Sequence, residues 1–410
     1  MSRHIESKPL TVAYISDNRY FEDQHGNWYT TASFPLADFV KAFPPTLRTW
    51  RFFGRLQTLP PDVPGFFPIT PPQGIKVEFH GPHFQLGELG GFLAHFLKYR
   101  ALIQECVLGA DIVWAKQSFV ATLIALWTKK PSSFVVTHLV GDPGDTLELR
   151  RGPLWRSIAR LSRYLNRRVL KNADVCLFVS KALQDRYALP DKPNVVVHDG
   201  RISTSQLVDS FKHDKPSPAI IMYVGRLSHE KGVDILMRAF AEAIGSSQIK
   251  MILKIIGDGP EKEQLVSLAV ILGIRDQAVF AGRISWGPSL FKEMHEATVL
   301  VLPSFTEGFG LVLLESLSQA TPVIASDVGG VKECIANGEA GLLVPAGDCT
   351  ALAKAIVLLV SDRKLQLQLA ERGLRHAAQN TLEYQVEKLR TIFTEMYQSK
   401  TLHYKYNKLE

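Results

Sequence analysis

Cysteine is scarce in this sequence. It has 4 cysteines in 410 residues, and they lie far apart along the chain. No CxxC pair and no histidine cluster with the spacing of metal ligands accompanies them. The scarcity argues against a disulfide framework and a zinc site, and it is typical of a protein from a reducing compartment.

Long apolar runs are absent as well. The longest, near Phe119 to Trp127, is far shorter than the ~20 residues that a membrane-spanning helix needs. The opening residues, MSRHIESKPL, lack the apolar core of a signal peptide. We therefore expect a cytoplasmic protein that does not cross a bilayer.

The charge is unevenly distributed. Residues 1–200 carry 24 Lys and Arg against 17 Asp and Glu, whereas residues 201–410 carry 23 of each, so the first half holds the whole net charge of +7. The excess lies largely between Arg150 and Arg186. Two halves that differ in this way are expected to bind different partners.

Short apolar runs alternate with longer amphipathic stretches, which is typical of parallel sheets covered by helices. In the first half the predicted strands are 11–16, 47–53, 75–80, 111–116, 133–138, 174–180 and 194–198. In the second half they are 219–225, 250–257, 278–282, 298–303, 322–326 and 341–345. The polar segment 201–219 is the best linker between the two sets. The sequence thus predicts an α/β fold of two doubly wound domains that face a cleft.

The most informative stretch is PSFTEGFGLVLLES (303–316), where a predicted strand gives way to a turn and a helix. Gly308 and Gly310 let the backbone approach a ligand, and the free N–H groups of a helix start favour an anion. Glu307 at the turn and Glu315, about two helical turns further on, can grip separate parts of one elongated ligand. Alternatively, the first glutamate complements the helix dipole and the second is solvated.

The stretch YVGRLSHEKG (223–232) has a similar order of elements. A predicted strand ends at Gly225, and Arg226 and Lys231 follow in a turn before the next helix. Two cations at such a junction suit a diphosphate leaving group, whose charge has to be neutralised. The alternative is a pair of surface charges. The glycine-rich strand end IIGDGP (255–260) is weaker evidence, because such turns are common.

Together these stretches resemble glycosyltransferase family four, a group of retaining enzymes with the GT-B fold. The resemblance covers most of residues 218–380. The motifs that carry it are GRLSHEKG (225–232), IIGDGP (255–260), FAGRIS (280–285), LPSFTEGFGLVLLES (302–316), PVIASDVGG (322–330) and NGEAGLLVP (337–345). It implies two Rossmann-like domains around a cleft and a transferase that takes a sugar from a UDP- or GDP-linked donor without a cofactor.

The resemblance also implies a division of the chain. Residues 1–205 would bind the acceptor, residues 206–380 would bind the nucleotide-sugar, and residues 381–410 would form a helix that crosses back to the first domain. The acceptor would be a glycan, a lipid-linked molecule or a small molecule, as in polysaccharide biosynthesis.

Roles follow for the matching residues. Arg226 and Lys231 would hold the donor diphosphate, Glu307 would contact hydroxyl groups of the donor sugar, and Glu315 would bind the ribose. Arg283 and Ile284 would lie beside the nucleobase. The full implied donor site is Gly26, Gly225, Arg226, Lys231, Gly257, Arg283, Ile284, Glu307, Gly308, Phe309, Gly310, Leu311, Val312 and Glu315.

The first half matches the family less well. His138 ends a predicted strand, where relatives often carry a histidine close to the transferred sugar. There it would act with Arg226, Lys231 and Glu307 in catalysis, through its carbonyl or its ring; the alternative is a buried core histidine.

Two further segments depart from the family pattern. Relatives usually have a Gly-Gly pair in the loop after the first strand, whereas the loop predicted for 16–31 contains only Gly26. This departure points to an unusual acceptor entrance. The usual Asn-Gly before the linker reads HDG (198–200) here.

The absence of any Asp-any-Asp triplet bears on mechanism. The usual carboxylate bridge between Mg²⁺ and a nucleotide-sugar is missing, so we expect a metal-independent enzyme in which Arg226, Lys231 and a helix start stabilise the leaving group. The resemblance implies retention by front-face attack, with the departing phosphate helping to deprotonate the acceptor. Glu307 and Glu315 are interpreted as binding groups, rather than as a glycosidase pair whose carboxyls flank one bond at ~5–5.5 Å.

The basic segment 150–171 (RRGPLWRSIARLSRYLNRRVLK) has helical periodicity. One predicted face carries Arg156, Arg160, Arg163, Arg167 and Lys171. The opposite face carries Leu154, Ile158, Leu161, Leu165 and Val169. One interpretation is a helix packed on its own sheet with a solvated basic face. The sharper one is a peripheral contact with anionic lipids or a lipid-phosphate acceptor. We expect no nucleic-acid partner, because no binding motif accompanies the charge.

Other functions share parts of this pattern. A nucleotide-sugar 2-epimerase has the same two-domain architecture but is not expected to carry this glutamate pair. A glucan phosphorylase needs a pyridoxal-phosphate lysine and a much longer chain. A catalytically silent carbohydrate-binding relative stays open, although the intact set of two cations and two glutamates argues against it.

Overall fold

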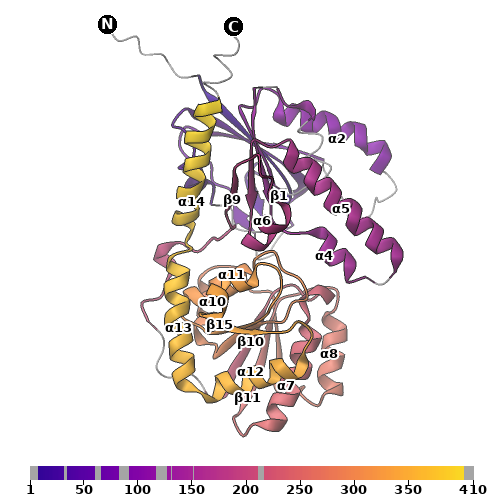
Figure 1. Ribbon diagram of the computed structural model, residues 1–410, viewed down its shortest axis with the longest axis vertical. Helices are drawn as coiled ribbons and strands as arrows, with labels where there is room; N and C mark the ends of the chain where they lie inside the picture. Colours follow the sequence, from indigo (N-terminus) through magenta and orange to yellow (C-terminus); the bar gives the residue numbers. More distant parts are fainter. Residues whose placement is uncertain are drawn as a thin grey trace.

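The computed structural model describes residues 8–31, 35–60, 66–82, 92–116, 127–130, 132–150, 152–210 and 217–400. In these ranges the chain forms two lobes, each built on a largely parallel sheet with helices around it (Figure 1). This arrangement confirms the predicted α/β fold of two doubly wound sheets. Most of the longest apolar run of the sequence lies outside the described residues. Within them, no helix combines the length and apolar character needed to cross a membrane.

The N-terminal sheet has seven parallel strands in the spatial order β5, β3, β1, β6, β7, β8, β9. Their bounds are β1 Leu10–Glu22, β3 Leu47–Thr58, β5 Lys76–His80, β6 Ile112–Lys116, β7 Phe134–Leu139, β8 Val175–Phe178 and β9 Asn194–Val196. The order of strands reverses between β1 and β6, so the carboxyl ends of these two strands mark the switch point where open α/β sheets bind ligands.

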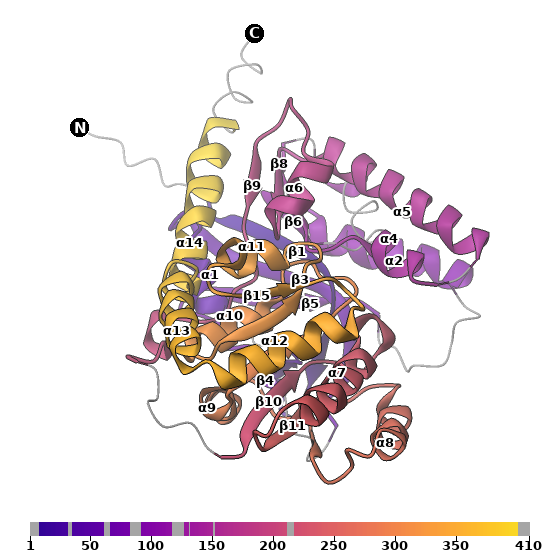
Figure 2. The ribbon, with the colours of Figure 1, turned by 60° about the horizontal axis from the view of Figure 1, so that its bottom comes forward.

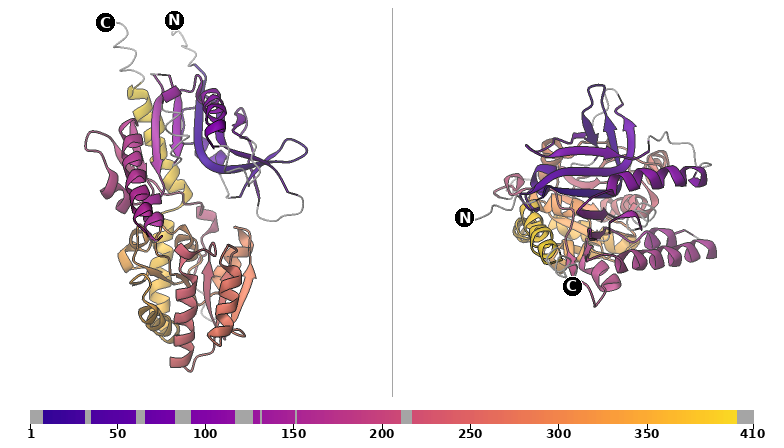
Figure 3. Two further views of the ribbon diagram at one scale, coloured as in Figure 1. Left: turned by 90° about the vertical axis from the view of Figure 1, so that its right-hand side faces the viewer. Right: turned by 90° about the horizontal axis from the view of Figure 1, so that it is seen from above.

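The predicted loop 16–31 is wrong in its first part, because β1 continues to Glu22. There it pairs antiparallel with β2 (Trp28–Thr30), which in turn pairs with β4 (Phe67–Pro68), so a ribbon projects from the sheet (Figure 3). Aromatic packing supports the extension: the rings of Tyr20 and Phe79 lie 5.3 Å apart, edge to face. Four consecutive polar residues, 16–19, hid this extension of the strand in the sequence.

The C-terminal sheet is wholly parallel, in the order β12, β11, β10, β13, β14, β15. Its strands are β10 Ala219–Val224, β11 Met251–Ile256, β12 Ala278–Gly282, β13 Val299–Leu302, β14 Val323–Ser326 and β15 Gly341–Val344. Successive side chains enter different cores: Ile221 packs in one cluster and Met222 in another. Both faces are therefore buried, as the unbroken apolar runs predict. The switch point lies between β10 and β13.

Helices connect and cover these strands (Figure 2). The shorter ones are α1 Leu36–Val40, α4 Pro143–Glu148, α6 Lys181–Tyr187, α9 Pro288–Glu296, α10 Leu311–Ser318 and α11 Val331–Cys334, with the 3₁₀ turns η2 Thr204–Gln206, η3 His229–Lys231 and η4 Ala336–Gly338. The longer ones are α2 Phe92–Val107, α5 Pro153–Lys171, α7 Val233–Ser246, α8 Lys262–Ile271, α12 Cys349–Ser361 and α13 Arg363–Ala378.

The last helices span both lobes. After α13, helix α14 (Leu382–Arg390) and the π-helical turn η5 (Thr391–Met396) run along the N-terminal lobe (Figure 1). Phe393 of η5 is buried and stacks on Phe43, with ring centroids 4.1 Å apart. The chain thus closes its N-terminal core with its C-terminal residues.

The lobes also touch around the cleft. The backbone N–H of Lys181 donates to the carboxylate of Glu333 at 2.5 Å. The ring of His198 stacks on Phe309 with centroids 4.6 Å apart. Finally, Gly308 approaches the Val140 carbonyl so closely that a Cβ at this position would lie 2.3 Å from the oxygen. These contacts fix the strand ends of one lobe opposite those of the other.

Candidate active site

Two adjoining cavities lie at carboxyl ends of the C-terminal sheet, the first at β10 and β13 and the second at β10, β11 and β12. The first, about 430 Å³, is lined by residues of both lobes. The second, about 510 Å³, is lined by the C-terminal lobe alone. Val224, Gly225 and Arg226 border both cavities, so a single elongated ligand can extend from one into the other. The location is the switch point that a doubly wound sheet offers to ligands.

An ion pair forms one wall of the first cavity. Lys231 at the end of η3 donates to Glu307 at 2.5 Å, and the hydroxyl of Ser304 donates to the same oxygen at 2.9 Å. Gly232 adopts φ 63°, and a Cβ there would lie 2.3 Å from the Pro303 carbonyl oxygen. Only glycine therefore lets the lysine turn approach the end of β13. The second carboxylate oxygen of Glu307 accepts no hydrogen bond from the described residues, so it can accept from a ligand hydroxyl.

The start of α10 forms the floor of the same cavity. Gly308, Phe309, Gly310, Leu311 and Val312 all line it. Gly310 has φ 86° and precedes the first residue of the helix. The free N–H groups of this helix start and the nearby cations make an anion-binding surface.

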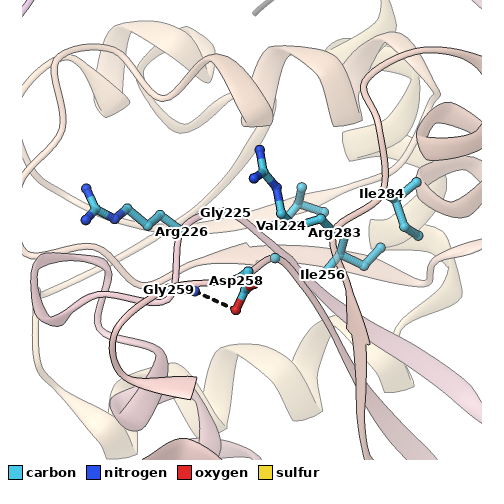
Figure 4. Close-up of a pocket in the computed structure, with 9 residues that line it drawn as sticks. Val224, Gly225, Arg226, Ile256, Asp258, Gly259, Arg283 and Ile284 are labelled. Atoms are coloured by element: carbon cyan, nitrogen blue, oxygen red, sulfur yellow. Dashed lines mark hydrogen bonds between the residues drawn. The ribbon is translucent and has the colours of Figure 1, made fainter. Parts of the chain in front are cut away.

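The second cavity combines cations with apolar side chains. Figure 4 shows Arg226 and Arg283 around the strand ends, with Ile284 beyond Arg283. Gly257 has φ 148°, and a Cβ there would lie 1.8 Å from the Gly225 carbonyl oxygen, so the neighbouring strand ends can only approach each other with glycine at this position. Asp258 also lines the cavity, and its carboxylate accepts from the N–H of Gly259. Such a cavity suits a flat ring beside a charged group.

Glu315 lies outside the lining of both cavities. It is 9% exposed, and its carboxylate accepts a hydrogen bond from the indole N–H of Trp286 at 2.9 Å. Burial raises the pKa of the Glu315 carboxyl, while Arg201 and the indole N–H oppose the rise. The structure thus places Glu315 next to the site, on the same face of α10 as Leu311, but covered by Trp286.

The N-terminal lobe contributes a second ion pair that the motifs do not reveal. Lys116 at the end of β6 and Asp199 after β9 lie 2.5 Å apart and line the first cavity. Burial raises the pKa of Asp199, but the positive charges around it, led by Lys116, lower it to about 2. One signal was present in the sequence, since Asp199 replaces the asparagine of the family's usual Asn-Gly.

His138 stands behind this pair rather than on the cavity wall. Its ring is 1% exposed, and burial lowers its pKa to about 4, so the imidazole is neutral near pH 7. Because Nε2 lies 3.0 Å from the Val197 carbonyl, Nε2 carries the proton and donates. Nδ1 then faces the Asp199 carboxylate at 3.9 Å.

Gly26 is not brought to either cavity. It lies exposed in the turn of the β1–β2 ribbon, with φ 79°, and its N–H donates to the Asp23 carbonyl. Its glycine identity therefore has a local reason, because the turn needs a positive φ. Among the described residues, no group of three or more His, Cys, Asp or Glu has the arrangement of a metal site.

The predicted orientation of the basic helix is wrong in part. Leu154 and Leu161 of α5 are 65% and 56% exposed, rather than packed on the sheet. The face that packs inward carries Ala159, Ser162, Asn166, Val169 and Leu170. Arg163 also turns inward and pairs with an acidic cluster of Asp142, Asp145 and Glu148.

Asp142 is the centre of that cluster. Its buried carboxylate accepts from the N–H of Gly144, the hydroxyl of Tyr187 and the guanidinium groups of Arg163 and Arg186. Of these donors only Arg163 belongs to α5, so its pairing with Asp142 holds one side of the helix against the lobe. Periodicity alone located the apolar and basic stripes but not the neighbour they face.

Residues 205–376 match the family described as Glycosyl transferases group 1. Over 221 residues the chain is 33% identical to the lipopolysaccharide core biosynthesis glycosyltransferase LpsE of Rhizobium meliloti. The match covers 53% of this chain and 63% of that protein. Over 310 residues it is 32% identical to the D-inositol 3-phosphate glycosyltransferase of Acidothermus cellulolyticus. This match covers 64% of this chain and 68% of that protein. The chain therefore spans less than two thirds of the first relative.

Solved structures share the two-lobed architecture. A sucrose-phosphate synthase from Thermosynechococcus elongatus superimposes with a TM-score of 0.73 at 19% identity, covering 95% of this chain and 100% of that one. The Anabaena protein HepE, in complex with UDP and glucose, superimposes with a TM-score of 0.63 at 18% identity, covering 95% and 100%. These likenesses show a shared GT-B fold.

Proposed function

Because the chain belongs to the glycosyl transferases group 1 family, we propose that it transfers a sugar from a nucleotide-diphosphate-sugar to an acceptor bound in the cleft. The observation that carries the proposal is the meeting of Arg226, Lys231 and the start of α10 at one cavity. All three present positive charge or free N–H groups to a single volume, as the departure of a diphosphate requires.

The two cavities fit the two ends of such a donor. In this proposal the nucleobase occupies the cavity beside Ile284 and Arg283, the diphosphate crosses the shared border at Arg226, and the sugar enters the first cavity. There Glu307, held by Lys231, binds sugar hydroxyls through its remaining acceptor capacity. UDP in the HepE complex supports a uridine or related donor; a GDP-linked donor is the alternative.

The leaving group can be stabilised by the protein's own charges. Two cations and a helix start act on the diphosphate, so the proposed transfer needs neither a metal ion nor a cofactor. We propose retention of configuration, with the departing phosphate accepting the proton of the acceptor hydroxyl. Glu307 serves this mechanism as a sugar-binding group, which is consistent with its ion pair to Lys231.

The acceptor is expected on the N-terminal side of the first cavity. Lys116 and Asp199 face this volume as an ionised pair, and a carboxylate beside an ammonium group offers both an acceptor and a donor to hydroxyl groups. In this proposal His138 lies behind Asp199 without a hydrogen bond to it, and its ring does not touch the sugar. These features favour a hydroxyl-rich acceptor, either a glycan or the sugar of a lipid-linked molecule.

Helix α5 supports the lipid-linked alternative. Its basic stripe (Arg156, Arg160, Arg167 and Lys171) is exposed, and its apolar stripe (Leu154, Ile158, Leu161 and Leu165), on the opposite side of the helix, is exposed or half-buried. A helix with exposed leucines on one face and basic residues on the other is typical of helices that lie in the interface of an anionic membrane. We therefore propose that α5 holds the enzyme at the cytoplasmic face of a membrane, where a lipid-linked acceptor would be found.

A panel of nucleotide-sugars tests the proposed function. We expect slow release of free sugar and nucleoside diphosphate from one UDP- or GDP-linked donor, and no reaction with the others. Isolation of the 2-epimer instead would support the epimerase. Tight binding of a sugar without hydrolysis or transfer of any donor would support a silent carbohydrate-binding protein.

A further inference from the structure

Glu315 accepts a hydrogen bond from Trp286, a contact that no family motif explains. Glu315 follows Leu311 and Val312 by about one helical turn, and those two residues line the first cavity. Glu315 itself is almost fully buried, and Trp286 donates to it at 2.9 Å. The group proposed to bind ribose is thus already hydrogen-bonded to the indole of Trp286.

Trp286 belongs to the segment that borders the second cavity. It follows Arg283 and Ile284, which line that cavity, and its ring packs edge-on against Phe291 of α9 at 5.2 Å. On its other side it contacts Phe67 of β4, also edge-on, with centroids 6.3 Å apart. Because β4 belongs to the N-terminal ribbon, the indole is held between both lobes at the border of the donor site.

We propose that Trp286 is a gate for the donor: its indole N–H and the ribose hydroxyls compete for Glu315, so the indole yields its hydrogen bond when the ribose binds. The inference rests on the proposed function, because it takes Glu315 as the ribose-binding carboxylate. A buried carboxylate without a donor is costly, so the indole N–H keeps Glu315 satisfied until hydroxyl groups replace it. The gate therefore competes with the nucleotide for Oε1 of Glu315, the oxygen to which the indole donates.

The ribbon gives the gate a connection to the acceptor lobe. When Trp286 leaves Glu315, its edge contact with Phe67 changes as well, so donor binding and the position of the ribbon are linked. The contact with Phe67 favours the indole position in which Trp286 donates to Glu315. Removal of the Phe67 ring should therefore weaken the competition with the nucleotide, in the same direction as removal of the indole N–H.

The substitution Trp286→Phe tests the competition, because phenylalanine keeps a ring but has no N–H. Calorimetry would first identify which of UDP and GDP the wild-type protein binds. We expect Trp286→Phe to bind that nucleotide about tenfold more tightly, since a hydrogen bond to a charged group is lost only from the empty state. Its 2′,3′-dideoxy analogue should bind both proteins equally. Phe67→Ala should tighten binding of the natural nucleotide by a smaller factor.

The controls separate the gate from the proposed function. Trp155→Phe removes a tryptophan of α5 and should leave nucleotide affinity unchanged. Weaker nucleotide binding by Trp286→Phe would overturn the gate and make Trp286 a wall of the binding site. Equal tightening for the dideoxy analogue would also overturn it, because the gain would not come from the ribose hydroxyls. If wild type binds neither nucleotide, or if Glu315→Gln leaves the affinity unchanged, the proposed function itself is contradicted.

Discussion

Lys231 offers the sharpest test of the proposed chemistry, because it has both a catalytic and a structural partner. Its ammonium group lies 2.5 Å from Glu307, and the two side chains are 24% and 12% exposed. The substitution Lys231→Ala therefore removes a charge from the leaving group and also leaves a shielded carboxylate with one fewer donor. The two effects can be measured separately, as a rate and as a melting temperature.

The size of each effect follows from the geometry. A unit charge ~4 Å from a phosphate oxygen contributes about 4 kcal/mol at an effective dielectric constant of about 20, and loss of one pre-organised group typically lowers the rate ~10²–10³-fold. After the substitution Glu307 keeps the hydroxyl of Ser304 as a donor. We therefore expect only about 1–3 kcal/mol of destabilisation, from the lost hydrogen bond and the shielded charge.

Two matched variants separate rate from stability. Arg226 is exposed, and no hydrogen bond or ion pair among the described residues involves its side chain. Arg226→Ala should lose the rate to a similar extent with an unchanged melting temperature. Lys41 forms an ion pair of similar length with Asp38, at 2.6 Å, but it is 69% exposed. Lys41→Ala should change neither quantity appreciably, because exposed pairs contribute ~0–1 kcal/mol.

The assay is transfer, or donor hydrolysis, at saturating donor, together with thermal unfolding of each variant. Near-normal turnover by folded Lys231→Ala protein would refute the assignment of Lys231 to the leaving group. A large rate loss in Lys41→Ala would show that the assay reports general damage rather than the lost charge.

The remaining predictions concern metal, membrane and stability. Transfer should persist in excess EDTA, and complete loss restored by Mg²⁺ or Mn²⁺ would contradict the metal-free mechanism. Wild-type protein should co-sediment with anionic vesicles at low salt and less at high salt, because each basic residue contributes about 1 kcal/mol near such a surface. Glutamine at the basic stripe, or at the two exposed leucines of the apolar stripe, should abolish vesicle binding but spare donor hydrolysis. Failure of wild type to bind the vesicles would contradict the membrane role. Asp142→Ala should destabilise the fold by roughly 3–5 kcal/mol, because it leaves buried donors unpaired; a change below 1 kcal/mol would refute this account of the cluster. Burial raises the pKa of Asp142, but its four donors hold it below the ordinary value. The stabilisation is therefore present above about pH 4 and is lost as the pH falls through the lowered pKa. Acid unfolding of Asp142→Asn should depend less on pH than that of wild type, and an unchanged profile would count against the cluster's role.

Some features of the site were visible locally in the sequence. The junctions at 223–232 and 302–316 could be predicted because a buried strand, a glycine turn and a helix start follow each other within a few residues. The structure places Arg226, Lys231, Glu307 and the backbone of 308–310 around one cavity, as those junctions require. Their positions relative to each other follow from adjacent parallel strands, whose carboxyl ends share one edge.

Other features involve residues distant in sequence, and no local pattern indicates such pairs. Lys116 and Asp199 are 83 positions apart and meet because β6 and β9 belong to the same sheet. Trp286 reaches Glu315 from another strand end, and Phe67 approaches it from the other lobe. A single sequence gives no distance between such positions.

The sequence by itself determined the alternation of strands and helices, the two parallel sheets and the glycine-bearing junctions, because each depends on apolar periodicity and backbone freedom within a short segment. Only the tertiary structure decided the length of β1, whose extension depends on aromatic partners in β3 and β5, and the outward direction of the leucines of α5. The face of α5 that packs inward carries Ala159, Ser162 and Asn166, and Arg163 pairs with Asp142, so the apolar stripe is turned toward solvent. Periodicity defines the faces of a helix, but the partner that each face meets is fixed by long-range packing.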